Sequence, residues 1–516
     1  MEGTPSSFFS FTNVAVETRD IVKTFPGVIA NDKVSLVVRK GEIHGLLGEN
    51  GAGKTVLMNI LYGLYKPDSG RIFVNGHEVK IDSPATAMKL GIGMVHQHFM
   101  LIPSLNVAEN IALGREPLKY GIFLDMKKLL HEIREFCSRY KLDVDLNASV
   151  YTLPVGVQQR VEILKALYRG ANILILDEPT SVLTPQEVGE LFRAIRVLKE
   201  QGKSIIFITH KLKEALEICD KITVLRSGKV IETVDAGKTS PDELAEMMVG
   251  RKVIYTFEKA QAKNDEIVLK VEGVKALDDR KLPALNGATF DVHAYEILGI
   301  AGVEGNGQTE LFEVLRGLRK IVEGRIYING VDVTNQPPAK RLKLGFSNIP
   351  EDRHKMGLIL EFSVEENLIL GEHNKSPFVD SLGRLNSKET KSYAEKLIEL
   401  YAIKTPSKDT ITRFLSGGTQ QRVVIAREFS RKPKLIVASQ PTRGLDVSAT
   451  EYVRRKLVEM RDQGCAVLLI SADLDEIIAL SDKIAVMYGG RIVAVKDPKK
   501  TNEQELGLLM AGEKIE

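Results

Sequence analysis

The sequence has few cysteines, and none lies where a disulfide or a zinc site would need it. The three residues, Cys137, Cys219 and Cys465, are far apart, odd in number and outside any CxxC spacing. A disulfide framework and a structural zinc site are therefore not indicated, and this usage fits a reducing cytosol.

The chain also lacks a strong charge of one sign and a long apolar run. Lys plus Arg number 71 against 68 Asp plus Glu, and a formal charge of +3 does not indicate broad binding to a nucleic-acid backbone. No apolar run approaches the roughly 18 to 20 residues that span a bilayer. The initial MEGTPSSFFSF has no basic region ahead of its short apolar patch. We therefore expect neither a membrane span nor export.

The composition is that of a large globular protein. Hydrophobic residues make up 43% and charged residues 27% of the 516 positions, which excludes a disordered, collagen-like or membrane-embedded chain. At one domain per about 100 to 200 residues, this length predicts two or more domains.

The chain repeats itself once. SGRIFVNGHEV from Ser69 matches EGRIYINGVDV from Glu323, and CDKITVLRSGKVI from Cys219 matches SDKIAVMYGGRIV from Ser481. A period near 250 residues is too long for a solenoid and indicates two copies of one domain. The predicted divisions are a first domain at 14–253, a polar linker at 254–265 and a second domain at 266–512.

Each copy has the pattern of an α/β fold. Short apolar, β-branched runs such as NILILDEP and KSIIFITH alternate with helical patterns. This alternation predicts a sheet of parallel strands joined by crossover helices.

A phosphate-binding loop is predicted at Gly48–Thr55. GENGAGKT follows the apolar run IHGLL and precedes the helical run VLMNILYGL, which is the strand, loop and helix order that such a loop needs. Successive backbone N–H groups can surround the phosphates, and the following helix adds its positive end. Lys54 neutralises phosphate charge and the Thr55 hydroxyl can ligate Mg²⁺. The predicted phosphate-binding residues are Asn50, Gly51, Ala52, Gly53, Lys54 and Thr55.

Two carboxylates follow a later apolar strand. Asp177 and Glu178 end ILILDE, and ligands of α/β folds bind at the carboxyl ends of the strands. Asp177 would hold Mg²⁺ directly or through water, and Glu178 would deprotonate the attacking water. His210, which closes the strand IIFITH, could bridge water and γ-phosphate. Alone, each feature also fits a structural role, but their order after a phosphate loop favours catalysis.

These motifs carry a family resemblance. The phosphate loop, GMVHQHFMLIP, a glycine signature, LDEPTS and ITH follow one another as in an ATP-binding-cassette (ABC) protein. The chain resembles the double-cassette ATPase subunit of bacterial importers for sugars and nucleosides, and HQHFMLIPSLNVAENI and GVEGNGQTE are most similar to the nucleoside branch. The resemblance implies an α/β fold of two tandem P-loop NTPase nucleotide-binding domains. Each has a mixed, largely parallel core sheet, an antiparallel β subdomain and a helical subdomain.

The resemblance also implies shared sites and partners. Each ATP lies between the phosphate loop of one cassette and the signature of the other. Phe25 would stack on adenine, and Gln97 would sense Mg²⁺ and the permease; without the resemblance, they are a packing residue and a surface amide. The implied cofactors are ATP and Mg²⁺, the latter held by Thr55, Gln97 and Asp177. The implied partners are two permease subunits and, indirectly, an extracytoplasmic solute-binding protein, with the chain peripheral on the cytoplasmic face of the cell membrane.

The second copy departs from the first wherever chemistry is expected. Gln308 stands in the place of Lys54, which removes a cation. An amide cannot act as a general base and a neutral hydroxyl is a poor Mg²⁺ ligand, so the second copy should not hydrolyse ATP. The remaining replacements are Ser439 for Asp177, Gln440 for Glu178, Glu351 for Gln97, Ala472 for His210 and Leu277 for Phe25.

The glycine signatures show the opposite pattern, because the signature of the second copy is nearly regular and that of the first copy is altered. The second copy reads LSGGTQQR, in which Ser416, Gly417 and Gly418 can approach a phosphate, although Thr419 departs from the family's LSGGQ. The first copy reads LPVGVQQR, in which Pro154 has neither a hydroxyl nor an N–H. Head-to-tail pairing would collect the intact parts in one site and the defective parts in the other.

We therefore predict that the chain is the ATP-hydrolysing subunit of a bacterial importer. The predicted solute is a nucleoside or a simple sugar, and a vitamin is a further alternative. The stretch HFMLIP after Gln97 is predicted either to contact the permease or to be a locally buried loop. The alternatives are a soluble tandem-cassette ATPase that acts on ribosomes or nucleic acid, and a nonenzymatic scaffold, which the intact first site disfavours.

Overall fold

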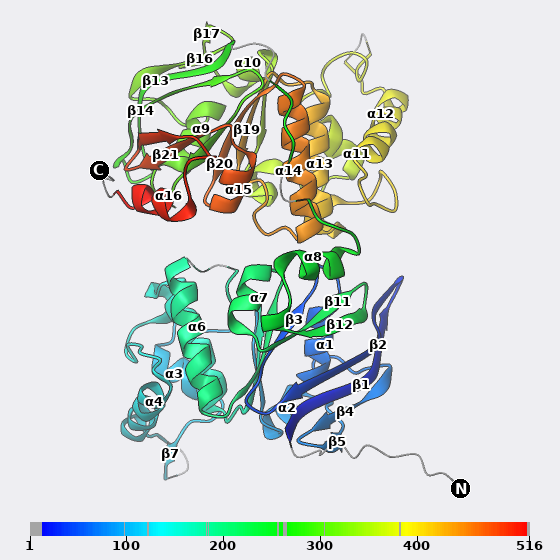
Figure 1. The fold of residues 1–516 in the computed structure, drawn as a ribbon, viewed down its shortest axis with the longest axis vertical. Helices are drawn as coiled ribbons and strands as arrows, with labels where there is room; N and C mark the ends of the chain where they lie inside the picture. The colour runs from blue at the N-terminus through cyan, green and yellow to red at the C-terminus, as the bar shows by residue number, and fades with distance from the viewer. Residues whose placement is uncertain are drawn as a thin grey trace. The chain divides into compact units, whose positions relative to one another are not determined.

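The computed structural model describes residues 13–97, 99–120, 123–181, 183, 185–254, 257–261, 266–303, 305–380 and 383–512. It divides into two compact units, unit 1 (Met1–Val253) and unit 2 (Ile254–Glu516) (Figure 1). Each unit is described below by itself.

The core of unit 1 is a six-stranded sheet in the order β12-β11-β3-β10-β9-β6. All neighbouring strands are parallel except β12, which pairs antiparallel with β11. Strands β3, β9, β10 and β6 are buried along their whole length, as expected for parallel strands covered on both faces. The strands are β3 (Ile43–Leu47), β6 (Ile92–Val95), β9 (Ile173–Asp177), β10 (Ser204–Thr209), β11 (Lys221–Arg226) and β12 (Lys229–Asp235).

A second, antiparallel sheet of unit 1 has the order β2-β1-β4-β5. Buried and exposed residues alternate along the second half of β2, as expected for a sheet that faces the core on one side. The strands are β1 (Val14–Phe25), β2 (Val28–Arg39), β4 (Ser69–Val74) and β5 (His77–Val79), and β7 (Leu118–Lys119) and β8 (Phe123–Leu124) form a separate short pair.

The helices of unit 1 cover the core sheet and form a subdomain at one side. Helices α3 and α4 lie on the opposite side of the unit from β1, β2 and β4 (Figure 1). The helices are α1 (Lys54–Leu61), α2 (Pro84–Lys89), α3 (Val107–Ala112), α4 (Met126–Tyr140), α5 (Val155–Tyr168), α6 (Pro185–Glu200), α7 (Leu212–Ile218) and α8 (Pro241–Val249), with 3₁₀ turns η2 (Val150–Thr152) and η3 (Ala236–Lys238).

Unit 2 repeats this topology. Its core sheet has the order β18-β19-β20-β15-β21-β22, with only β22 antiparallel, and its second sheet has the order β14-β13-β16-β17. The strands are β13 (Ile267–Leu277), β14 (Pro283–His293), β15 (Ile297–Ala301), β16 (Glu323–Ile328), β17 (Val331–Asp332), β18 (Phe346–Ile349), β19 (Leu435–Ser439), β20 (Ala466–Ser471), β21 (Lys483–Tyr488) and β22 (Arg491–Lys496).

The helices of unit 2 follow the same order, with one added turn and, among the residues that the structure describes, no counterpart of η3. A π-helical turn, η4 (Arg353–Gly357), follows β18. The helices are α9 (Gln308–Arg316), α10 (Pro338–Lys343), α11 (Val364–Ile369), α12 (Ser387–Leu400), α13 (Gly417–Ser430), α14 (Val447–Asp462), α15 (Leu474–Leu480) and α16 (Glu503–Met510), with the 3₁₀ turn η5 (Thr412–Phe414).

The predicted fold class is confirmed: each unit has a largely parallel core sheet, an antiparallel sheet and helices. The division falls between Val253 and Ile254. The predicted linker at 254–265 lies partly outside the described residues. Its described part packs on unit 2, where the Lys259 ammonium donates to the Ser481 carbonyl at 2.8 Å.

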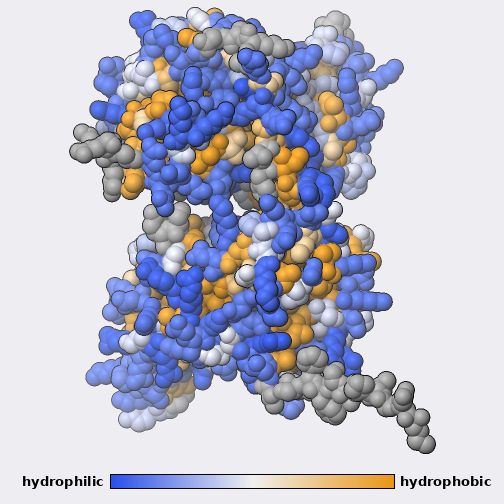
Figure 2. Space-filling view, in the orientation of Figure 1, coloured by the Kyte–Doolittle hydropathy of each residue, from blue (hydrophilic) through white to orange (hydrophobic). Residues whose placement is uncertain are grey.

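The face shown in Figure 2 is mostly hydrophilic, with apolar side chains gathered in patches on both units. Within the described residues, no helix has the length and apolar character needed to cross a membrane. All three cysteines are free.

Candidate active site in unit 1

The phosphate loop of unit 1 is fixed by close backbone packing. It leaves the buried strand β3 and enters α1, whose N-cap Gly53 has a φ of 98°. A Cβ at Gly53 would lie 2.2 Å from the Ala30 carbonyl oxygen, so only glycine fits. The Asn31 amide donates to the Gly53 carbonyl at 3.1 Å. Asn31 could not be predicted from the sequence, because no motif links it to a loop that lies over twenty residues further along the chain.

Lys54 and Thr55 begin α1 with their side chains at the loop. The Lys54 ammonium is buried and donates to the carbonyls of Gly48 at 2.7 Å and Glu49 at 3.0 Å. The Thr55 hydroxyl makes a hydrogen bond to the carboxylate of Asp177. The structure therefore brings the predicted cation, the predicted hydroxyl and the first predicted carboxylate together.

Asp177 and Glu178 lie at the carboxyl end of β9 in different environments. Burial, followed by the charge of Glu178, raises the pKa of Asp177 to about 6. Burial also acts to raise the pKa of Glu178. The hydrogen bond and charge of His210, together with the charges of Lys54 and Lys211, outweigh that effect, so the pKa of Glu178 lies below its ordinary value. Glu178 is therefore a carboxylate at neutral pH, as a general base must be.

Glu178 is held between two predicted site residues. His210 Nδ1 lies 2.9 Å from Glu178 Oε1, and the Gln97 amide donates to Glu178 Oε2 at 3.1 Å. Glu178 itself has a φ of 46°, which is uncommon for a residue other than glycine. His210 and Gln97 thus orient the carboxylate from either side.

The donors around Asp177 fit a magnesium ion that also binds phosphate. Within the described residues, no group of three or more His, Cys, Asp or Glu could hold a metal ion by itself. Mg²⁺ usually takes one or two carboxylates together with substrate phosphates and water. One buried carboxylate paired with a hydroxyl, beside a phosphate loop, matches that requirement.

Phe25 ends β1 with its ring exposed, as an adenine platform would be. Its ring contacts Tyr65 edge-on at a centroid distance of 5.5 Å, and the Lys23 ammonium lies 5.6 Å from the ring centre. Tyr65 was not predicted from the sequence, because it follows α1 outside any motif.

Unit 2 keeps the backbone of this site without its charges. Gly307 has the φ of Gly53, 98°, and Gln440 has the φ of Glu178, 46°. Gln308 donates to the Ile300 carbonyl at 3.3 Å, and the Gln440 side-chain oxygen accepts the Ala472 N–H at 3.3 Å. The amides that replace Lys54 and Glu178 therefore serve the fold of unit 2.

The two signatures begin helices of equal length but with different caps. In α13, the exposed Ser416 is the N-cap and its hydroxyl accepts the Thr419 N–H at 3.3 Å. In α5, the N-cap Pro154 makes no side-chain cap. Ser416, Gly417 and Gly418 lie in unit 2, whereas the other predicted site residues lie in unit 1.

The surroundings of helices α5 and α13 also differ beyond the first turn of each helix. A cavity of about 140 Å³ lies beside α5 in unit 1. It is lined by Tyr62, Met88, Ile92, Gly93, Met94, His96, Met100, Glu162, Lys165, Ala166, Arg169 and Ala171. In unit 2, the positions of Gly93 and Ala166 are held by Ser347 and Glu428.

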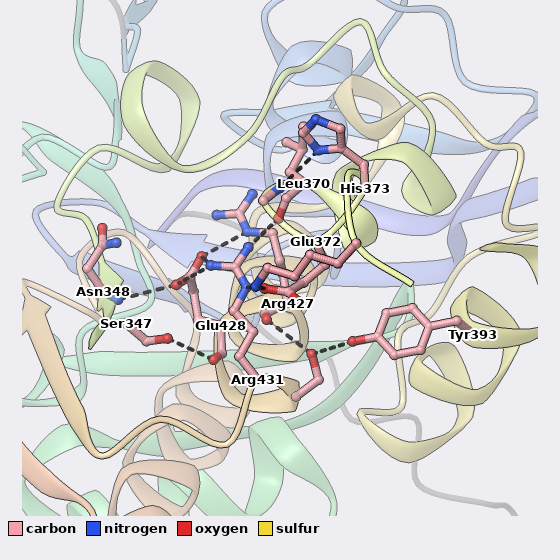
Figure 3. Close-up of polar contacts among 12 residues, drawn as sticks. Ser347, Asn348, Leu370, Glu372, His373, Tyr393, Arg427, Glu428 and Arg431 are labelled. Carbon is pink, nitrogen blue, oxygen red and sulfur yellow. Dashed lines mark hydrogen bonds and ion pairs between the residues drawn. The ribbon is translucent and has the colours of Figure 1, made fainter. Parts of the chain in front are cut away.

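Side chains of unit 2 bond to one another at those positions (Figure 3). The Ser347 hydroxyl donates to the Glu428 carbonyl at 3.0 Å, and the Glu428 carboxylate pairs with Arg427 at 2.9 Å and Arg431 at 3.4 Å. Burial acts to raise the pKa of Glu428, but the two guanidinium groups outweigh it and keep that pKa low. Ion pairs in unit 2 thus replace the small residues that border the cavity of unit 1.

Comparison with known proteins places the chain in a family. The profile of the family described as ABC transporter matches residues 31–181 and 285–443, one segment in each unit, which together exceed half of the chain. The chain belongs to the ABC transporter family. The predicted membership is confirmed, and with it ATP as the nucleotide and ATP hydrolysis as the activity of this subunit.

Relatives in this family match the ABC subunit over nearly its whole length. It is 52% identical to the guanosine import ATP-binding protein NupO of Bacillus subtilis strain 168, over 96% of this chain and 97% of that protein. It is 45% identical to the glucose import ATP-binding protein TsgD13 of Haloferax volcanii, over 96% of this chain and 95% of that protein.

A solved structure resembles the ABC subunit over nearly its whole length. The archaeal ribosome recycling factor aABCE1, solved with the ribosomal stalk protein aP1, is 20% identical over 96% of this chain and 92% of that one, with a TM-score of 0.62. At this identity, the likeness concerns the fold alone.

Proposed function

We propose that the ABC subunit drives uptake of a nucleoside through a separate permease, using one hydrolytic site assembled from both units. The subunit would lie on the cytoplasmic face of the cell membrane and bind two permease subunits, which receive solute from an extracytoplasmic binding protein. A simple sugar is the alternative solute, since a relative that is 45% identical is a glucose import protein.

The sorting of intact and altered residues supports one shared site. Unit 1 has Lys54, Asp177 and Glu178 but an altered signature, and unit 2 has an intact Ser416 signature but no cation or carboxylate at those positions. Losses scattered at random between units would not divide this way. The division is expected if Ser416, Gly417 and Gly418 close the nucleotide bound by unit 1.

The residues of unit 1 supply the steps of hydrolysis. Lys54 and the loop N–H groups bind the phosphates, and Glu178 takes a proton from the attacking water. His210 and Gln97 hold the Glu178 carboxylate toward that water. Thr55, Asp177 and Gln97 would hold Mg²⁺, which offsets the charge of the phosphates when it is bound.

The permease contact is proposed at the HFMLIP stretch after Gln97. His98 lies outside the described residues, but Met100 is 60% exposed and Ile102 is 38% exposed. Met100 also lines the cavity beside α5, and its carbonyl accepts the Lys165 ammonium at 2.6 Å. An exposed apolar stretch that borders a cavity suits a partner helix or loop.

Reconstitution with the permeases encoded beside this gene would test the proposal. Vesicles holding the complex should accumulate labelled guanosine in the presence of ATP, and an excess of adenosine or uridine should compete. Uptake of labelled ribose or glucose in place of guanosine would establish a sugar importer instead. Co-purification with ribosomes rather than permeases would overturn the transport function.

A further inference from the structure

A carboxylate from its own unit occupies the start of the unit 1 signature helix. Helix α5 begins at Val155, and Pro154 offers its N–H groups no side-chain cap. The Gly156 N–H donates instead to Glu187 Oε1 at 3.2 Å, from the first turn of α6. A Cβ at Gly156 would lie 2.4 Å from that oxygen, so the approach depends on glycine.

The matching position of unit 2 carries no such group. Gly418 corresponds to Gly156, and a Cβ there would lie 3.0 Å from the methyl group of Ala449, which corresponds to Glu187. A Cβ at the preceding Gly417 would lie 2.7 Å from a guanidinium nitrogen of Arg353, in the added turn η4. The start of α13 therefore meets a methyl group and a cation where the start of α5 meets an anion.

This difference decides which helix can receive a phosphate. The first N–H groups of a helix and its dipole attract one anion, and a second anion at the same place is repelled. We propose that Glu187 takes the place of a phosphate and closes the unit 1 signature to ATP, whereas Ala449 leaves the unit 2 signature open. This inference rests on the shared site proposed above. It assigns the inactivity of the second site to an added charge as well as to lost residues.

Binding of a second nucleotide tests the role of Glu187. The full chain carrying Glu178→Gln keeps ATP intact and allows both sites to be titrated with labelled Mg·ATP. Adding Glu187→Gln preserves the size and one accepting oxygen of the side chain but removes its charge. We expect the weaker site to bind ATP at least about fivefold more tightly, within the range of charge effects at helix ends. An unchanged affinity of the weaker site would overturn the proposal.

Thermal unfolding separates this role from a purely structural one. Glu187→Ala loses the cap of α5 and should lower the Tm, whereas Glu187→Gln should leave it nearly unchanged. If Glu187 were only a cap, the affinity of the weaker site would stay constant in both variants.

The reciprocal change tests the open signature. Ala449→Glu places a carboxylate beside Gly418 and should lower ATP turnover at least about tenfold. Ala449→Gln, of equal size and without charge, should stay within about threefold of the parent. Equal turnover in the two variants would contradict the proposal, and the Glu187 titration decides the question if Ala449→Glu does not fold.

Ser416→Ala distinguishes failure of the inference from failure of the shared site. Full turnover by Ser416→Ala would refute the shared site itself. Lost turnover by Ser416→Ala, together with unchanged second-site affinity in Glu187→Gln, would refute only the role of Glu187.

Discussion

The two units have the same backbone at the nucleotide-binding end and different chemistry on it. Their core sheets have matching strand orders, and the strand-end residues Glu178 and Gln440 share a φ of 46°. A positive φ is costly for a residue other than glycine and persists only where the surroundings impose it. Unit 2 retains this conformation although Gln440 can accept no proton from water. The packing of the strand end therefore fixes the backbone in both units, which differ at this position in the side chain.

Replacing Glu178, the proposed general base, gives the largest expected effect. Glu178→Gln should lower ATP turnover by about 100-fold to 10,000-fold, because an amide cannot take the proton of the attacking water. Gln440→Ala, at the matching position of unit 2, should leave turnover within a fewfold of the parent. Both are measured as phosphate release at saturating Mg·ATP. Steady ATP turnover by Glu178→Gln would mean that the carboxylate of unit 1 and the amide of unit 2 do not differ in catalysis.

Replacing Lys54, the cation of the phosphate loop, gives the next largest expected effect on ATP turnover. Lys54→Ala removes a charge-assisted contact to the phosphates and should lower kcat/KM for ATP by about 10-fold to 100-fold. Gln308→Ala loses only an internal contact with the Ile300 carbonyl and should stay within about threefold. A comparable loss in both variants would mean that unit 2 also contributes a working phosphate loop.

The sequence alone predicts those parts of the fold and site that depend on local order. The phosphate loop, the acidic pair and His210 each follow an apolar strand, and the structure brings Thr55 to Asp177 and His210 to Glu178. The repeat predicts two units because whole strands and turns match between them. The motifs are short in sequence, and the matching strands and turns recur in both halves of the chain.

Contacts that join distant helices and strands could not be predicted in this way. The Gly156 N–H bonds to a carboxylate on α6, and the Gly53 carbonyl accepts from Asn31 on β2. Neither partner lies in a motif, and their spacing depends on how helices and strands pack. A position-by-position comparison of the units, which sets Glu187 against Ala449, is the one signal that could have indicated the first contact.

Asn31 gives a stability difference between the units. The matching residue in unit 2 is Leu285, which packs near Gly307 without a hydrogen bond to it. Asn31→Ala removes a buried donor from the Gly53 carbonyl and should destabilise unit 1 by about 1–2 kcal/mol. Leu285→Ala should destabilise unit 2 by about 2–5 kcal/mol through a cavity instead. Denaturant unfolding measures both, and a neutral Asn31→Ala would show that the loop holds its shape without this amide.

The pH dependence of magnesium use gives the smallest expected effect, and only unit 1 can show it because Ser439 does not titrate. Burial and the charge of Glu178 raise the pKa of Asp177 to about 6, above its unfolded value, so folding favours the protonated form. The nucleotide-free protein should therefore gain stability as pH falls through 6, while a proton on Asp177 competes with Mg²⁺. Between pH 7 and 5.5, the Mg²⁺ concentration for half-maximal Mg·ATP binding should rise about fourfold.

The variant Glu178→Gln removes the charge next to Asp177 and should move this transition to lower pH. A transition that stays in place would show that burial alone sets the pKa of Asp177.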